Sequence, residues 1–200
     1  MPHNNTTKIL IAGVGGQGIV YLSDILVEAS LLAGIPTGVS EIHGLSQRGG
    51  TVTSSITFGK NSYGFIEEGG ADFLIGLEPL EAIRCNNLLH GESVAVIDVK
   101  RIIPYAVNTG SVPYPDTGRF IEYLKENIRK VIRIKDDLPG IEPVMRNIIV
   151  LGVTASQKKF PVDSRFIDKI VGKISPEHLK YFRDAVNNPL TYSYFGKSKN

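Results

Sequence analysis

Cysteine is nearly absent from this sequence, and its scarcity limits the redox chemistry open to the chain. Cys85 is the one cysteine, so no disulfide can form within the chain and no CxxC pair exists. Because an iron–sulfur cluster is held by about four thiolates, the chain cannot hold one on its own. The sequence therefore predicts no metal or cluster site in this chain.

Long hydrophobic runs and an excess of one charge are also missing. The apolar runs fall far short of the roughly 20 residues that cross a bilayer, and residues 1–7 are polar, with no apolar signal core. There are 22 Lys and Arg against 20 Asp and Glu, and the basic stretch at residues 125–135 is typical of a solvated helix face. We expect a cytoplasmic protein that binds neither membranes nor nucleic acid.

Short apolar runs alternate with amphipathic stretches, which is the pattern of βαβ units and a largely parallel sheet. The first unit is a buried strand (residues 8–14, KILIAGV), a glycine-rich turn and a helix that should stop near Gly34 and Pro36. A second helix is expected to begin near Pro79, since proline suits a first helical turn. Further strands are predicted at residues 37–42, 71–77, 93–99 and 131–134.

One segment interrupts this alternation. Residues 51–58 (TVTSSITF) are rich in β-branched side chains and are followed by a turn sequence at residues 59–62 and by residues 63–66. The pattern predicts a β-hairpin, inserted where a doubly wound domain would have a helix.

The last part of the chain has helical patterns. Residues 117–129 are amphipathic, residues 141–157 are apolar enough for a buried helix, and Asp163 and Ser175 suit the N-caps of two C-terminal helices. We therefore expect an α/β fold: a Rossmann-like, mostly parallel sheet with an inserted β-hairpin and C-terminal helices. A single domain is expected over residues 1–200, with a small helical C-terminal extension from about residue 161 as the alternative division.

The turn after the first strand fits G-x-G-x-x-G through Gly13, Gly15 and Gly18. Glycine lets a phosphate approach backbone N–H groups, and the helix N-terminus adds a partial positive charge. A tight strand-to-helix turn favours glycine for steric reasons alone, but Gly15, Gly16 and Gly18 are more glycines than that turn requires. We interpret this turn, including Gln17, as an anion-binding or close-contact site.

A second dense segment, residues 40–50 (SEIHGLSQRGG), combines a carboxylate, an imidazole, an amide, a guanidinium and three glycines. Glycines around a polar run let a loop bend and expose its side chains. Each polar residue alone has a plain structural explanation, but the cluster indicates a ligand- or partner-binding surface. The residues assigned to it are Glu41, His43, Ser46, Gln47, Arg48, Gly49 and Gly50.

GVGGQG (residues 13–18) followed by SEIHGLSQRGG (residues 40–50) resembles the gamma-type domain of the 2-oxoacid:ferredoxin oxidoreductases. The likeness is strongest to the small, or beta, subunit of the indolepyruvate enzymes. DFLIGLEPLEA (residues 72–82) and NIIVLG (residues 147–152) extend the resemblance to nearly the whole chain.

The resemblance implies a division of labour between subunits. In that family a large subunit carries thiamine diphosphate and [4Fe–4S] clusters, and the complex decarboxylates a 2-oxoacid, passes electrons to ferredoxin and releases an acyl-CoA. It implies that this chain is a non-cofactor subunit, inactive alone, of an enzyme for indolepyruvate or another aryl pyruvate. Coenzyme A is the implied co-substrate.

Two other functions fit parts of the sequence. A NAD-dependent dehydrogenase would use the glycine turn, with Glu41 at the end of the second strand holding a ribose hydroxyl. A stand-alone nucleotide- or CoA-binding module would use the turn alone. No catalytic His–Asp or Ser–Tyr–Lys arrangement is evident downstream to support the dehydrogenase.

The two loops are expected to form one surface that faces the large subunit. This expectation assumes that the first and second strands are neighbours, which would bring Glu41 and Arg48 beside the glycine turn. Arg48 could then pair with a carboxylate or phosphate outside the chain, or with Glu41 inside it.

Overall fold

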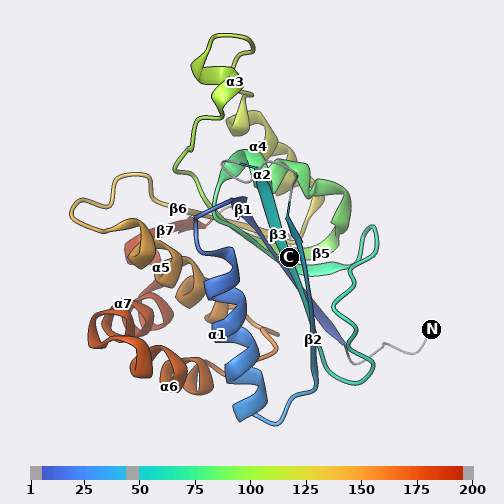
Figure 1. Cartoon of the computed structure of the whole chain (residues 1–200), viewed down its shortest axis with the longest axis vertical. Helices are drawn as coiled ribbons and strands as arrows, with labels where there is room; N and C mark the ends of the chain where they lie inside the picture. The colour runs from blue at the N-terminus through green and yellow to red at the C-terminus, as the bar shows by residue number, and fades with distance from the viewer. Residues whose placement is uncertain (1–5, 44–49, 196–200) are drawn as a thin grey trace.

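The computed structural model describes residues 6–43 and 50–195, which form a seven-stranded mixed β-sheet with helices on both faces (Figure 1). The strands are β1 (Thr7–Val14), β2 (Thr37–His43), β3 (Thr51–Phe58), β4 (Ala71–Gly76), β5 (Leu89–Asp98), β6 (Lys130–Ile134) and β7 (Ser193–Phe195). The helices are α1 (Ile19–Leu32), α2 (Pro79–Arg84), the 3-10 turn η1 (Asn86–Leu88), α3 (Tyr105–Asn108), α4 (Thr117–Asn127), α5 (Pro143–Ala155), α6 (Ser164–Ile174), α7 (Pro176–Asn187) and α8 (Pro189–Tyr192). The predicted α/β class is confirmed.

The strands are arranged in the order β2-β3-β1-β4-β5-β6-β7. β1, β4, β5 and β6 run parallel to one another, so their carboxyl ends share one edge of the sheet. β3 is antiparallel to both of its neighbours, β1 and β2, and β7 is antiparallel to β6. The parallel centre therefore lies between antiparallel borders.

The centre of the sheet is buried on both faces, which explains why its strands are nearly continuous apolar runs. In β1, Ile9 and Ile11 face the layer of α1, α5, α6 and α7, while Leu10 and Ala12 face the layer of α2 and α4. α6 and α7 share the first of these two cores with α1 and α5. No helix in the described ranges is long and apolar enough to cross a membrane.

The predicted caps of the two C-terminal helices are confirmed. The Asp163 carboxylate accepts a hydrogen bond of 2.9 Å from the backbone N–H of Arg165, at the start of α6. The Ser175 hydroxyl accepts one of 3.1 Å from the N–H of Glu177, at the start of α7. These bonds satisfy donors that the first helical turn leaves free.

The predicted hairpin of residues 51–66 is wrong in its second strand. Residues 63–66 form no strand, and β3 pairs instead with β1 and β2. A Cβ atom on Gly64 would lie 2.5 Å from the backbone carbon of Val39, so this segment crosses the backbone of β2 closely. The N–H of Gly64 donates to the Thr57 hydroxyl at 2.9 Å and not to a strand ladder. The hairpin is formed by β2 and β3.

The expectation that the first and second strands are neighbours is also wrong. β3 lies between β1 and β2, and the sheet is less parallel than expected because β3 and β7 are both antiparallel. A short loop can join antiparallel strands, whereas parallel strands need a crossover of a dozen or more residues. Residues 44–50 are too few for such a crossover, so β3 returns beside β2.

We predict that Gly152→Ala destabilises the protein, because α5 and α7 touch at this glycine. A Cβ atom there would lie 2.7 Å from the Cβ of Ala185 and 2.9 Å from the carbonyl oxygen of Phe182. Overpacking of this kind costs about 1–3 kcal/mol. Gly172→Ala in α6 is the control, since its Cβ would meet only the flexible end of Leu179, at 3.3 Å.

Urea unfolding followed by circular dichroism measures both variants. Gly172→Ala should be neutral or stabilising by up to about 1 kcal/mol, from helix propensity. A free energy of unfolding for Gly152→Ala equal to that of the parent protein would contradict the prediction.

Candidate functional site

A cleft of about 750 Å³ opens at the carboxyl ends of β1, β4 and β5, between the N-termini of α1 and α5. Its walls are the glycine turn, the residues after β4 and β5, and the first turn of α5. From β1 the sheet continues through β3 on one side and β4 on the other. In open α/β sheets, ligands bind at such a point outside the carboxyl ends of the strands.

The Gln17 side chain holds the glycine turn against the sheet. Its Oε1 accepts a hydrogen bond of 2.6 Å from the N–H of Val14, and its Nε2 donates one of 3.0 Å to the carbonyl of Leu77. A Cβ atom on Gly13 would lie 2.8 Å from that Oε1. Gly13 and Gln17 are therefore needed together to shape the turn.

Asn147, just after the first turn of α5, fixes the other side of the glycine turn. Its Nδ2 donates a hydrogen bond to the carbonyl oxygen of Gln17. A Cβ atom on Gly18 would lie 3.1 Å from this Nδ2, and Gly16 and Gly18 have φ angles of 91° and 86°. L side chains rarely adopt such angles, so both positions favour glycine.

Several backbone donors in the turn are free to bind a ligand. The N–H of Gly15 donates to Gly50, and that of Gln17 to Val14. Within the described part of the chain, no acceptor meets the N–H of Gly16, Gly18 or Ile19, and no side chain caps α1. The first turn of α1 has no acidic residue either, so its partial positive charge can attract an anion.

A buried ion pair lies on the wall formed by β5 and α5. The Arg146 guanidinium donates to both oxygens of Asp98, at 2.8 and 2.5 Å, and these side chains are 4% and 6% exposed. Its remaining donors reach the carbonyls of Lys135 and Asp136. Asp98 is thereby neutralised, while Lys100, which also lines the cleft and has no ion pair among the described residues, adds a positive charge.

Gly50, the last residue of the second loop segment (residues 40–50), contacts the glycine turn. The N–H of Gly15 donates a hydrogen bond of 2.9 Å to the carbonyl of Gly50. Ser46, Gln47, Arg48 and Gly49 lie outside the described residues, as does the side chain of His43.

Glu41 is not placed at the cleft. Glu41 pairs with Ser54 in β3, and Ser54 pairs with Ile11 in β1. Glu41 is therefore level with Ile11, which lies three residues before the end of β1. Two strand spacings, about 10 Å, separate Glu41 from Ile11 across the sheet. Its exposed side chain does not line the cleft, which removes the geometric basis for a ribose contact.

The sequence patterns did not identify Tyr21, Arg146 and Asn147 as residues of the cleft. Tyr21 lines it, and its hydroxyl forms a hydrogen bond of 2.9 Å with Nδ1 of His178, while burial raises the pKa of Tyr21. The sequence did contain one indication of Arg146 and Asn147. They are polar residues near the start of an otherwise apolar helix, a position where polar side chains are expected to have a specific partner.

Cysteine chemistry is not supported. Burial, together with the nearby Glu81 carboxylate, raises the pKa of the Cys85 thiol to about 11, so the thiol is protonated at neutral pH. Among residues 6–43 and 50–195, no three His, Cys, Asp or Glu side chains are grouped so that they could hold a metal ion. The donors of the cleft suit binding of an anion.

The glycine turn and the cleft lie at the carboxyl edge of the sheet, the edge at which open α/β proteins as a class bind their ligands. The sequence matches the family described as pyruvate ferredoxin/flavodoxin oxidoreductase over residues 8–186, and the chain belongs to this family.

Named relatives match over nearly their full length. The indolepyruvate oxidoreductase subunit IorB of Methanothermobacter thermautotrophicus is 32% identical over 186 residues, which covers 89% of this chain and 95% of the relative. The subunit of the same name from Archaeoglobus fulgidus is 29% identical, covering 92% and 96%.

Solved structures share the fold. The pyruvate oxidoreductase subunit PORC of Thermotoga maritima gives a TM-score of 0.62 at 16% identity, over 97% of this chain and all of that one. The gamma subunit of a keto/oxoacid ferredoxin oxidoreductase from Geobacter sulfurreducens gives 0.63 at 18% identity, over 96% and 100%. The 2-oxoglutarate:ferredoxin oxidoreductase of Magnetococcus marinus gives 0.61 at 14% identity, over 94% of this chain and 31% of that one.

We predict that Arg146→Ala strongly destabilises the protein, because it leaves the Asp98 carboxylate buried and unpaired. Losing one partner of such a pair costs about 3–5 kcal/mol. Arg165→Ala is the control, since the Arg165–Asp163 pair is exposed and should contribute little. Chemical unfolding compares the two; similar losses in both variants would show that burial of the Asp98–Arg146 pair has no special role.

Proposed function

We propose that this chain is the small subunit of a cytoplasmic 2-oxoacid:ferredoxin oxidoreductase that acts on indolepyruvate or another aryl pyruvate. One observation carries the proposal: the chain aligns with about 95% of the length of a subunit named for indolepyruvate oxidoreductase. The reaction is oxidative decarboxylation of the 2-oxoacid to an acyl-CoA, carried out together with a larger partner subunit.

The proposal assigns the redox cofactors to that partner. Thiamine diphosphate and [4Fe–4S] clusters belong to the large subunit, and ferredoxin accepts the electrons from the complex. The sequence supports this assignment, since one cysteine cannot supply the roughly four thiolates that a cluster needs.

We further propose that the cleft receives a phosphate of coenzyme A, the co-substrate. The free N–H groups of Gly16 and Gly18 and the positive charge of Lys100 fit an anion, and the cleft is large enough for part of an extended ligand. The Magnetococcus marinus enzyme was solved with 2-oxoglutarate, coenzyme A and succinyl-CoA bound, and 31% of its chain shares this fold. The thioester chemistry takes place at the partner, while this chain binds and orients the co-substrate.

The rival dehydrogenase is less well supported, since Glu41 lies away from the cleft. A stand-alone CoA-binding module stays compatible with the cleft itself. Copurification of the chain with a large, cluster-bearing, thiamine-dependent subunit separates the leading proposal from both alternatives.

We predict that the isolated chain is inactive and that activity appears only with the large subunit. Indolepyruvate-dependent dye reduction, with coenzyme A present, is measured for the chain alone, the large subunit alone and the mixture. Dye reduction by this chain alone would overturn the proposal.

We predict that Gly16→Ala impairs the reconstituted enzyme while Gly34→Ala does not. Both glycines have a positive φ and open space around them, so each substitution carries a similar backbone strain of about 1–2 kcal/mol. Only Gly16 lines the cleft, where a methyl group would hinder close approach of a phosphate.

Steady-state kinetics with coenzyme A as the varied substrate measures this difference, with subunit titration to separate assembly from turnover. We expect at least about a tenfold loss of kcat/KM for coenzyme A in Gly16→Ala, equivalent to roughly 1.4 kcal/mol. Equal kinetics for the two variants would mean that the turn has only a structural role.

A further inference from the structure

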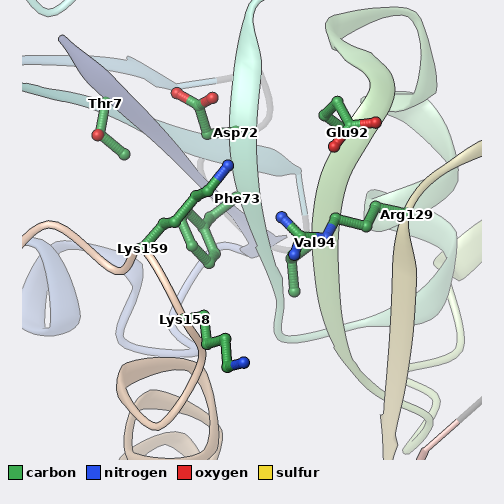
Figure 2. A pocket seen from close by; sticks show the side chains of 8 residues that line it. All are labelled: Thr7, Asp72, Phe73, Glu92, Val94, Arg129, Lys158 and Lys159. Atoms are coloured by element: carbon green, nitrogen blue, oxygen red, sulfur yellow. The ribbon is translucent and has the colours of Figure 1, made fainter. Parts of the chain in front are cut away.

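A small hollow of about 100 Å³ lies at the sheet edge opposite the cleft (Figure 2). Thr7 and Phe73, near the amino-terminal ends of β1 and β4, line it together with Val94 of β5, which pairs with Phe73. Since a strand rises about 3.3 Å per residue, the length of β1 separates the hollow from the glycine turn by roughly 20 Å or more. The hollow is thus a separate feature, independent of the proposed function.

Three cationic side chains line this hollow, although the Lys158 ammonium points away from Arg129 and Lys159 in the view of Figure 2. Arg129 comes from the connection between α4 and β6, and Lys158 and Lys159 come from the turn after α5. In the view of Figure 2, Arg129 and Lys159 extend from opposite sides toward the same space. Within the described residues, no carboxylate forms an ion pair with any of the three.

The two carboxylates in the lining offset only part of this charge. Asp72 accepts a hydrogen bond of 2.8 Å from the backbone N–H of Lys8, and its other oxygen lies 3.6 Å from Nε2 of His90. Asp72 is therefore engaged in the structure of the strand ends. Both carboxylates keep their negative charge, so Asp72 and Glu92 together face three cations, which leaves the hollow with an excess of one positive charge.

A fourth cation adds to the crowding. Burial lowers the pKa of Lys130, and the neighbouring charges of Arg129 and Lys158 lower it further. The Lys130 ammonium donates a hydrogen bond of 2.8 Å to Gln157. Like charges held this close repel one another, and an anion between them would relieve the repulsion.

The turn that carries the lysines is held in place. The Phe160 ring packs edge-on against Phe73 at a centroid distance of 5.4 Å, and the N–H of Phe160 donates to the carbonyl of Gln157. Lys159 has a φ of 68°, in the left-handed region that a lysine rarely adopts. Such backbone strain persists only where the surroundings enforce it.

We propose that this hollow binds a phosphate-type oxyanion, either inorganic phosphate or the terminal phosphate of a nucleotide. Its volume of about 100 Å³ suits a small group such as one tetrahedral oxyanion. Arg129 supplies a planar fork of donors for two phosphate oxygens, and Lys158 and Lys159 supply the balancing charge.

Isothermal titration calorimetry of the full chain at low ionic strength tests this proposal, with inorganic phosphate and ADP titrated separately. The variants are Arg129→Gln and Lys159→Gln, with circular dichroism to verify the fold. Lys173→Gln is the control, because it removes one positive charge from the exposed C-terminal end of α6. We expect saturable binding that each of the two variants weakens about tenfold or more and that Lys173→Gln leaves unchanged.

The two titrants distinguish the sources of the anion. Tighter binding of ADP, weakened by the same two substitutions, assigns the site to a nucleotide phosphate, whereas preference for inorganic phosphate assigns it to the free ion. The proposal is overturned if neither titrant binds saturably, or if Lys173→Gln weakens binding as much as Arg129→Gln does.

Discussion

The buried ion pair between Asp98 and Arg146 holds together the segments that form the cleft. Asp98 ends β5, Arg146 lies in the first turn of α5, and the other guanidinium donors bind the loop between β6 and α5. Desolvating two charges is costly, so such a pair is tolerated only when its geometry and hydrogen bonds are nearly complete. The next residue, Asn147, then reaches the glycine turn through Gln17.

This arrangement leaves donors unsatisfied where a ligand can use them. Gln17 and Asn147 fill the inner side of the turn, and Gly50 accepts the N–H of Gly15, while the N–H groups of Gly16 and Gly18 meet no acceptor among residues 6–43 and 50–195. The rigidity of the turn thus comes from side chains behind it. A site that is fixed before its ligand arrives loses less entropy on binding.

Local features of the fold were predictable because their causes lie within a few residues. The caps Asp163 and Ser175 and the strand character of residues 51–58 follow from residue types at short spacing. The partner of β3 was not predictable, since a β-branched run specifies a strand but not its neighbour. Residues 63–66 have the sequence pattern of a strand, but Gly64 packs closely against the backbone of β2, and this contact determines the path of the segment.

The same limit applies to the site. The glycine turn lies within one short segment, so its pattern indicated its place in the fold. Arg146 and Asn147 are about 130 residues away from it in sequence, and only packing of α5 beside α1 brings them there. Glu41 shows the converse. It was expected beside the glycine turn because β1 and β2 were taken as neighbours, but β3 lies between these two strands and separates Glu41 from the turn.

The position of β2 at the border of the sheet affects how the subunit can associate. Its outer side pairs with no strand of the described chain, and Val39 and Ile42 on it are 47% and 66% exposed. An open strand edge with apolar side chains is a template for unwanted pairing between chains. A protein that paired with the outer side of β2 would remove this template, so assembly at that edge would also protect the chain against aggregation.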